Sequence, residues 1–421
     1  MTSINKAHRI SNFEQRKALF LSTFAFTICF AVWTIFSILG IKLKQELGLS
    51  DTELGLLMAT PILTGSISRL FLGVLTDRFG GRWVFGLLML VTAMAVFSLT
   101  VASSYPMLLL SALGIGLAGG SFIVGVAYVS TWYEAGKQGT ALGIFGAGNV
   151  GSAITSFGAP FLLLAFGWQV TAQWYAIILA CVGIGFIIFA KTDPVSRERQ
   201  VKSIPLIEQL APLSDIRVWR FSLYYFFVFG AFVSLALWLP HYLTEVYHLD
   251  LVTAGIVATL YTVPASLFRV LGGWLSDKFG ARKIMYWTLS ASVFCTFLLS
   301  YPPTQYQVHG VEHIYRFSLE TPLVVFVLLI FVLGFFMSLG KAAVFKHIPV
   351  YYPEHVGVVG GAVGMVGGLG GFFLPLTFGM LNDVIGIWQS CFMLLFVVCV
   401  SALAWMHFAI RRAENKEWSE G

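Results

Sequence analysis

Apolar runs long enough to cross a lipid bilayer are the strongest constraint on how this chain can fold. A helix needs about 20 predominantly apolar residues to span roughly 30 Å of hydrocarbon. Twelve such runs begin near residues 18, 53, 84, 106, 139, 169, 219, 252, 284, 322, 357 and 386. Only 11% of the residues are charged, whereas soluble proteins have about 25%. The sequence therefore predicts an all-α integral membrane protein with twelve transmembrane helices.

Cysteine and glycine patterns do not indicate a metal or nucleotide site. The five cysteines all fall inside apolar runs, without the paired external spacing of a disulfide framework. Residues 114–119 (GIGLAG) and 146–151 (GAGNVG) satisfy the pattern G-x-G-x-x-G, but both lie inside apolar runs and not after a strand. We therefore expect no metal, no cofactor and no enzymatic activity.

Basic residues are distributed unevenly between the two sides of the predicted bundle. An even number of spans puts both termini on one side. Placing that side inside the cell assigns nineteen of the 26 basic residues to the cytoplasm and three to the outside. By the positive-inside rule, this predicts a multi-pass protein of the cytoplasmic (inner) membrane with both termini cytoplasmic. The net charge of +6 reflects this bias and does not indicate nucleic-acid binding.

The two halves of the chain share a repeated segment. Residues 65–82 read GSISRLFLGVLTDRFGGR, and residues 265–282 read ASLFRVLGGWLSDKFGAR. The longest polar segment separates the halves. The sequence thus predicts a six-helix half over residues 1–190, a cytoplasmic linker over residues 191–218, and a second six-helix half with a short cytoplasmic tail over residues 219–421.

This layout resembles the major facilitator superfamily. The segment after the second and eighth spans resembles that superfamily's Asp-Arg-x-Gly-Arg loop. The resemblance implies a gating role for five residues, which would close the cytoplasmic side through helix termini and arginine partners: Asp77, Arg78, Arg82, Asp277 and Arg282. Alternatively, the basic residues set topology alone. Topology, however, does not require the acid and the glycine that recur in both halves.

Arg69 and Arg269 occupy matching positions in the repeat, each eight residues before the loop aspartate. That spacing places them about 12 Å inside the membrane, where each arginine costs about 2.5–3.5 kcal/mol on insertion scales. All 20 Asp and Glu residues fall in loops or near span ends, so structural ion pairs with carboxylates are not expected. The planar guanidinium offers paired N–H donors that match oxyanions. The interior therefore predicts a site for a small anion.

Glycines are concentrated in the fifth and eleventh spans. Small residues four apart allow close helix packing, a role expected for Gly143, Gly146, Gly148, Gly151, Gly364, Gly367, Gly368 and Gly371. The segment GAGNVG followed by Pro160, and GGLGGFFLP ending at Pro375, resemble the two nitrate signatures of the nitrate/nitrite porters (NarK type). These porters are a family within the major facilitator superfamily, and the resemblance covers nearly the whole chain.

The resemblance implies a pocket in which two arginines and two aromatic rings hold a planar anion. The implied substrate-binding residues are Arg69, Arg269, Asn149, Tyr225, Phe122, Phe345 and Phe229. From the residues alone, a phenylalanine inside a span more often serves packing. An asparagine there can instead bond a neighbouring helix.

Two lysines in the tenth span, Lys341 and Lys346, are candidates for proton coupling. We expect Lys341 to add a third positive charge near the arginines and to take up a proton together with the anion. The segment GKAAVFKH resembles the porter subgroup thought to be proton–nitrate symporters. For Lys346 and His347 the alternative is a position at the cytoplasmic rim, with the charged end outside the hydrocarbon.

Together these features predict a monomeric secondary transporter in a lipid bilayer. Its substrate would be nitrate and also nitrite, with uptake coupled to protons. Nitrate/nitrite exchange is the first alternative, and a carrier for another organic or phosphate-bearing anion is the second. A membrane sensor or membrane-embedded enzyme is the third, but no appended domain, metal cluster or nucleophile–base set supports it.

Overall fold

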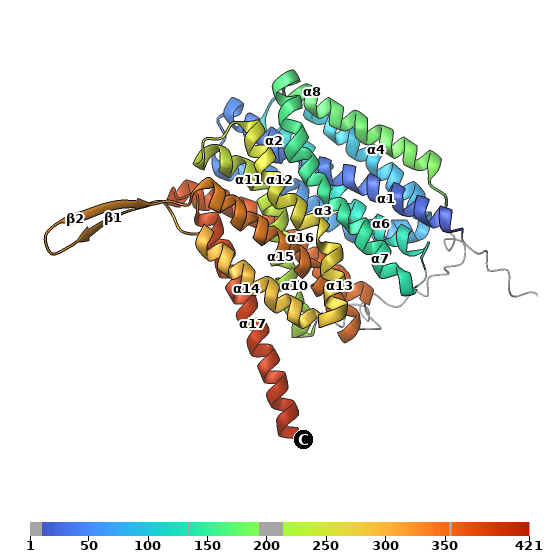
Figure 1. Cartoon of the computed structure of the whole chain (residues 1–421). Helices are drawn as coiled ribbons and strands as arrows, with labels where there is room; N and C mark the ends of the chain where they lie inside the picture. Colours follow the sequence, from blue (N-terminus) through green and yellow to red (C-terminus); the bar gives the residue numbers. More distant parts are fainter. Residues whose placement is uncertain (1–10, 134, 193–213, 353–355, 421) are drawn as a thin grey trace, which may run out of the picture.

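The computed structural model describes residues 11–133, 135–192, 214–352 and 356–420 as a bundle of helices with one β-hairpin (Figure 1). The first half of the chain contributes α1 (Asn12–Trp33), α2 (Phe36–Leu47), α3 (Asp51–Phe79), α4 (Gly81–Leu99), α5 (Tyr105–Ile115), η1 (Gly116–Gly120), α6 (Ser121–Ser130), α7 (Ala135–Gly146), η2 (Ala147–Val150) and α8 (Gly151–Phe189). The second half contributes α10 (Ile216–Tyr225), η4 (Phe226–Ala231), α11 (Phe232–Val246), α12 (Leu251–Leu267), α13 (Arg269–Phe279), α14 (Ala281–Leu299), β1 (Thr304–His309), β2 (Ile314–Leu319), α15 (Leu323–Tyr351), α16 (Val356–Ile385) and α17 (Ser390–Glu420).

The predicted spans all fall on helices. In the described part of the chain, eight helical stretches are long and apolar enough to cross a membrane, or nine if the bent pair α12–α13 is one span. One of the eight, Thr140–Phe189, is divided at Gly167, whose φ of 79° and ψ of 170° are not helical. α3 and α14, where two further spans are expected, are not among these stretches. The chain is a multi-pass membrane protein.

The sequence repeat is also a repeat of backbone geometry. Gly80 lies between α3 and α4 with φ 83° and ψ 144°, and Gly280 lies between α13 and α14 with φ 84° and ψ 136°. Positive φ favours glycine because a Cβ atom would be strained there. The backbone geometry that the two loops share explains why glycine occurs in both. The predicted linker lies mostly outside the described residues, so the division into domains remains a prediction.

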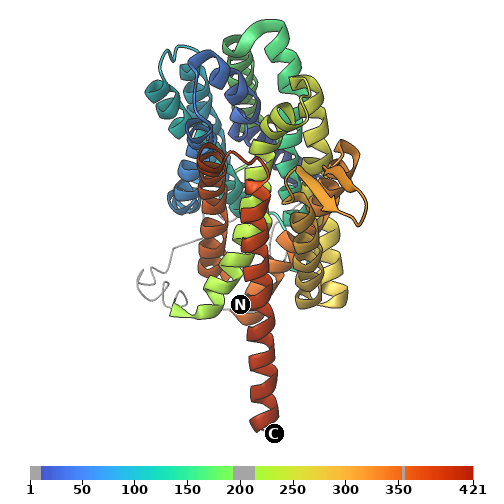
Figure 2. The same ribbon diagram turned by 90° about the vertical axis from the view of Figure 1, so that its left-hand side faces the viewer.

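Two ends of the bundle can be distinguished by the chain path. At the terminus end α1 begins and α17 ends; α17 runs along the bundle and projects beyond it (Figure 2). At the distal end lie the connections α2–α3 and α16–α17. Between the halves, α3 packs along α16 and α8 packs along α12. The outer surface exposes large apolar side chains, as expected for contact with lipid, among them Phe20, Phe71, Leu110, Leu164 and Phe408.

The hairpin between α14 and α15 adds two strands to the predicted all-α architecture. β1 and β2 pair antiparallel, and the rings of Tyr306 and Phe317 stack at 5.2 Å. The hairpin projects from the bundle at the distal end (Figure 1). Its residues alternate between polar and apolar, a pattern typical of strands that is easily overlooked in a connecting segment this short.

Candidate anion-binding site

The two interior arginines come from different halves and meet at one aromatic ring. Arg69 lies on α3, and Arg269 is the first residue of α13, directly after the bend at Phe268. The guanidinium carbons lie 5.9 Å and 5.8 Å, respectively, from the centre of the Phe122 ring on α6. The structure therefore brings Arg69, Arg269 and Phe122 together in the centre of the bundle, as the sequence repeat and the family resemblance both imply.

Backbone carbonyl groups orient Arg69. Its Nε donates to the carbonyl oxygen of Gly119 at 3.2 Å, and its Nη1 donates to that of Gly364 at 3.3 Å. Gly119 belongs to the first half and Gly364 to α16 of the second half, so the side chain also joins the halves. Trp33 and Phe229 flank the guanidinium at 5.8 Å and 5.7 Å. Fixed in this way, Arg69 keeps its remaining N–H donors for a ligand.

Arg269 is less completely bonded. Its Nη1 is buried without a hydrogen-bond partner in the described part of the chain. A Cβ atom at Gly146 would lie 3.3 Å from this nitrogen, so the glycine leaves room beside it. A buried, unpaired guanidinium nitrogen is costly, and an oxyanion in this position would satisfy it.

Aromatic rings link the surroundings of the two arginines. Tyr225 stacks on Phe229 at 5.1 Å, and its ring meets Phe345 edge to face at 4.9 Å. Phe345 in turn lies 6.0 Å from the Arg269 guanidinium. The Tyr225 hydroxyl lies near enough to both arginines to interact with each. Together with Arg69, Arg269 and Phe122, these rings form a closed circuit of contacts.

The π-helical turn η4 places part of this circuit. Tyr225 ends α10, and Phe229 lies within η4, so one extra residue per turn shifts the following side chains around the helix axis. Such turns are rare and often occur at functional sites. Periodicity in the sequence does not predict it.

Asn149 is buried in η2, with only 1% of its surface exposed. Neither its Oδ1 nor its Nδ2 has a hydrogen-bond partner among the described residues. The alternative considered above, a bond to a neighbouring helix, is therefore not seen in the described part of the chain. Both polar atoms of this amide are therefore unpaired among the described residues.

Replacing Asn149 with leucine tests this role. We expect the KM for the transported anion to rise about tenfold, since one hydrogen bond to a charged group is worth about 1.5 kcal/mol. The Tm should stay unchanged or rise, because the unpaired buried amide is removed. Uptake kinetics and thermal unfolding of the purified protein measure the two effects. A lower Tm with an unchanged KM would show that Asn149 serves packing.

Lys341 is fully buried on α15, with 0% of its surface exposed. Its Nζ lies 3.3 Å from the centre of the Phe232 ring and has no hydrogen-bond partner in the described residues. The lysine is also close enough to Arg269 for their charges to interact. A third basic residue therefore lies near Arg269 in the interior.

Lys346 lies at a different depth from Lys341. Its side chain is 46% exposed and forms an ion pair with Asp277 at the terminus end. Lys346 follows Lys341 by five positions. Five positions are more than one helical turn, so Lys346 lies nearer the membrane surface. The alternative of a rim position is the one the structure supports.

No carboxylate pairs with the three interior basic residues in the described part of the chain. None of the ion pairs found there includes Arg69, Arg269 or Lys341. This agrees with the expectation that Asp and Glu residues, which lie in loops and near span ends, do not pair with these interior basic residues. A buried positive site without an internal partner favours a bound anion.

The predicted gating residues are only partly described. The side chains of Asp77 and Arg78 lie outside the described residues. Arg82 donates to the carbonyl oxygen of Ile187 at 2.8 Å, within its own half, and Arg282 lies at the start of α14. Asp277 forms an ion pair with Lys346. Their role in gating remains a prediction.

The glycines of the two signatures differ in what surrounds them. A Cβ atom at Gly151 would lie 2.1 Å from the Thr27 carbonyl oxygen, and one at Gly367 would lie 2.2 Å from Tyr225 Cδ1. Gly146, Gly148, Gly368 and Gly371 also have close neighbours. At Gly143 and Gly364, by contrast, a Cβ atom would meet nothing within 4 Å. These two do not serve close helix packing in this conformation.

Gly151→Ala and Gly143→Ala form a matched pair. Gly151→Ala is expected to lower stability by about 1–3 kcal/mol, the usual cost of overpacking, because backbone atoms of α1 block the new methyl group. Gly143→Ala should be neutral or stabilising by about 0.5–1 kcal/mol, since alanine favours helix. Thermal unfolding in one detergent compares the two. Equal Tm values would contradict the packing role of Gly151.

Several supporting residues were not identified from the sequence. Phe26 stacks on Phe145 at 4.8 Å, and Phe145 stacks on Phe122 at 5.9 Å, so these rings hold Phe122 in place. Trp33 contacts Arg69, and Phe232 contacts Lys341. Phe232 lies three residues after Phe229, a spacing that would have suggested the same helix face.

Comparisons with known proteins agree with this fold. The family model described as Major Facilitator Superfamily matches residues 20–311 and 253–420. The chain is 43% identical over 419 residues to a Thermus thermophilus protein named "Probable nitrate/nitrite antiporter NarK1", covering 96% of this chain and 94% of that protein. It is 31% identical over 407 residues to the "Nitrite extrusion protein" of Bacillus subtilis (strain 168), covering 96% and 98%.

Solved structures show the same architecture at lower identity. One is a bacterial homolog of the human lysosomal transporter Spinster, in an inward-facing and unoccupied conformation, with a TM-score of 0.73, 17% identity, and coverage of 95% of this chain and 98% of that chain. Another is the human organic anion transporter MFSD10, with a TM-score of 0.68, 15% identity, and coverage of 93% and 99%. The family model and the 43% identical relative show that the chain belongs to the nitrate/nitrite porter family of the major facilitator superfamily.

Proposed function

We propose that this protein carries nitrate, and also nitrite, across the cytoplasmic membrane by alternating access. The observation that carries the proposal is the meeting of Arg69 and Arg269 at Phe122 without a neutralising carboxylate in the described residues. The two most similar relatives given above are named for nitrate or nitrite, which supports this choice of anion.

The shape of the site favours a small flat anion. Two guanidinium groups supply paired donors for the oxygens of nitrate. Aromatic faces are electronegative, so the rings shape the slot and the arginines supply the attraction. A larger organic anion would need further polar groups, while the rings in this circuit are mostly phenylalanine.

Two mechanisms could drive transport of the anion. We favour uptake coupled to protons, because the buried Lys341 has no partner in the described residues and can exchange a proton as the anion arrives. Nitrate/nitrite exchange is the second candidate, supported by the word antiporter in the name of the Thermus thermophilus relative.

We further propose that the terminus end faces the cytoplasm and the distal end faces outward, and that the protein works as a monomer. The distribution of basic residues supports this orientation. Labelling of a cysteine introduced into the β1–β2 turn with a membrane-impermeant reagent in intact cells tests it. Protection of that cysteine in cells, with labelling only after lysis, would reverse the orientation.

Uptake into proteoliposomes tests the substrate. Nitrate, nitrite, chloride and a monocarboxylate are compared, with and without a pH gradient. We expect saturable uptake of nitrate, competition by nitrite, and little response to the other two. Strong monocarboxylate uptake without a nitrate response would refute the proposal.

A further inference from the structure

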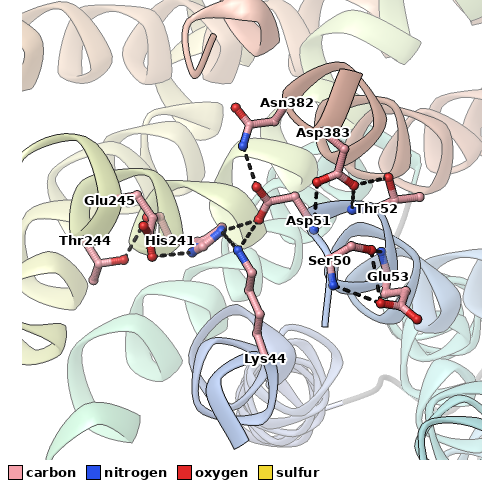
Figure 3. A network of polar contacts seen from close by, with 10 residues as sticks. All are labelled: Lys44, Ser50, Asp51, Thr52, Glu53, His241, Thr244, Glu245, Asn382 and Asp383. Carbon is pink, nitrogen blue, oxygen red and sulfur yellow. Dashed lines mark hydrogen bonds and ion pairs between the residues drawn. The ribbon is translucent and has the colours of Figure 1, made fainter. Parts of the chain in front are cut away.

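The distal end carries two features that lie away from the anion site. One is a polar cluster between the halves, in which Asp51 accepts hydrogen bonds from Lys44 and Asn382 (Figure 3). His241 Nε2 lies 2.9 Å from the same carboxylate. Asp383 in turn accepts a hydrogen bond from the backbone N–H of Asp51 at 3.2 Å. Both aspartates thus have partners inside the protein, whereas the second feature, the hairpin β1–β2, projects from the bundle (Figure 1).

The hairpin has two chemically different faces. In an antiparallel pair, residues directly opposite each other share a face, and successive residues of one strand alternate between faces. One face is apolar apart from a single threonine: Thr304, Tyr306, Val308, Tyr315, Phe317 and Leu319. The other face is polar apart from a single isoleucine: Gln305, Gln307, His309, Ile314, Arg316 and Ser318. We call these the apolar face and the polar face of the hairpin.

The bundle leaves the apolar face largely uncovered. Four of its side chains are between 46% and 60% exposed: Val308, Tyr315, Phe317 and Leu319. A two-stranded hairpin alone is at best marginally stable in water. Contiguous exposed apolar side chains mark a surface that contacts another protein or a membrane. The apolar face therefore indicates a partner outside the described part of the chain.

Short connections fix the level of the hairpin relative to the membrane. β2 ends at Leu319 and the membrane-spanning helix α15 begins at Leu323, a distance of at most about 14 Å in an extended chain. On the other side, residues 300–303 join α14 to β1. The Tyr247 hydroxyl, just after α11, donates to the carbonyl oxygen of Thr321 at 3.0 Å. The base of the hairpin thus lies where α15 enters the membrane.

The lipid-facing surface of the bundle leads up to the hairpin. Phe297, near the end of α14, and Val324 and Leu328, at the start of α15, have exposed side chains. Exposed apolar side chains on membrane-spanning helices contact lipid, and the apolar face follows them within a few residues of chain. Lipid is therefore the partner with which this part of the surface is already continuous.

Charge and area argue against a protein partner for the apolar face. The acidic and basic residues of segment 300–322 are Glu312, Arg316 and Glu320, and none of them lies on this face. Two strands of six residues present a face of about 20 Å by about 10 Å, or roughly 200 Å². A stable protein interface buries about 800 Å² on each partner. The face is thus too small to hold a second copy of the chain by itself.

We infer that the apolar face of the hairpin binds lipid at the headgroup–acyl boundary of the membrane surface at the distal end. The inference goes beyond the proposed function, because it involves no transported anion. Tyr306 and Tyr315 suit this boundary, where the ring meets acyl chains and the hydroxyl meets water. Anchors of this kind restrain the tilt of the helices to which they are joined, here α14 and α15.

The backbone of the hairpin sets the depth of binding. The sheet has two strands, so each strand has one edge without a β-strand partner. Unpaired backbone N–H and C=O groups cannot enter hydrocarbon. The polar face also carries Arg316, which favours water or lipid headgroups over acyl chains. The hairpin therefore lies along the membrane surface and does not insert into the hydrocarbon core.

Fluorescence quenching by lipid compares the two faces. An environment-sensitive NBD probe is attached to a cysteine introduced as Val308→Cys on the apolar face or Gln307→Cys on the polar face. The exposed native Cys181 is replaced with serine in both proteins, while the other four cysteines are buried or inside the bundle. The full-length protein is placed in phosphatidylcholine nanodiscs that hold one copy each. Phosphatidylcholine with a nitroxide near the headgroup, or near the end of the acyl chain, is the quencher.

We expect strong quenching on the apolar face alone. The nitroxide near the headgroup should quench the probe at position 308 at least about threefold more than the probe at position 307, because an apolar face inserts about 5–10 Å into this boundary. The nitroxide at the end of the acyl chain should quench both probes weakly. Leu319→Cys and Ser318→Cys repeat the comparison on β2, so misfolding of one labelled protein leaves a second pair as the test.

A matched pair of variants tests whether the apolar side chains are responsible. Phe317 and Ile314 lie on opposite faces of β2 and are 51% and 52% exposed. Each is replaced with threonine, which favours strands, in the Val308→Cys protein. Phe317→Thr should lower the quenching by about half or more, because it removes apolar area from the face that meets lipid. Ile314→Thr should leave the quenching unchanged. Both should keep the Tm and elution profile of the parent protein.

Three results would overturn the inference. The first is equal quenching on the two faces, and the second is quenching at position 308 that Phe317→Thr does not reduce. The third is a blue-shifted emission at position 308 without quenching by nitroxide lipid, because protein and not lipid would then cover the apolar face. The nanodiscs contain no substrate, so these results do not depend on the proposed function or on which end of the bundle faces the cytoplasm.

Discussion

Nitrate uptake by the Arg269→Lys variant is expected to fall roughly 100-fold. Arg269 has a buried Nη1 without a partner in the described residues, so this nitrogen is available to the anion. Lysine keeps the charge but replaces the planar fork with a single point charge. Losing one charge-assisted hydrogen bond costs about 1.5–3 kcal/mol, and each 1.4 kcal/mol is about a tenfold effect. Initial uptake rates in proteoliposomes measure the loss.

Arg69→Lys should have an effect of similar size for a different reason. Arg69 uses Nε and Nη1 to bond the carbonyl oxygens of Gly119 and Gly364, and a lysine cannot bond both while also reaching the anion. Arg316→Lys on the exposed strand β2 is the matched control, with normal uptake expected. Normal uptake by either interior variant would show that charge alone suffices there.

Replacing Lys341 with methionine is expected to abolish uptake driven by a pH gradient while leaving nitrate/nitrite exchange. Lys341 is fully buried against Phe232, so an unbranched apolar side chain fits its place. Removing an unpaired buried charge should not destabilise the protein. The variant lacks a group that can carry the proton, whereas the two arginines that bind the anion remain.

The measurement compares two driving forces in the same vesicles. Uptake is driven either by an inward proton gradient or by nitrite loaded inside. Lys346→Met is the control, because its exposed ion pair with Asp277 contributes about 0–1 kcal/mol at most. Undiminished proton-driven uptake in Lys341→Met would exclude this lysine from coupling.

The depth of individual charged residues in the membrane could be predicted from the sequence. The bilayer requires helices of a certain length, and the repeat aligned Arg69 with Arg269 at one level. The placement of the acids in loops and span ends predicted that these cations have no internal partner. The family resemblance then implied Phe122, Phe345 and Tyr225, all of which the structure places beside the arginines.

The faces on which helices meet were not predictable in this way. Lys341 and Lys346 look alike in sequence, yet one is buried on Phe232 and the other pairs with Asp277 at the rim. The π-helical turn that places Phe229, and the hairpin β1–β2, depend on local geometry that hydropathy does not describe.

By itself the sequence determined the membrane class, the two-half repeat, the depth of the arginines and the sign of the ligand's charge. These follow from hydropathy and charge, which are properties of single segments. Only the tertiary structure decided that both arginines share the Phe122 ring, and that Asp51 meets His241 and Asn382 at the distal end. The contacts of Asp51 join residues 190 and 331 positions apart in the chain. Only the packing of one half against the other creates them and brings Arg269 to the Phe122 ring.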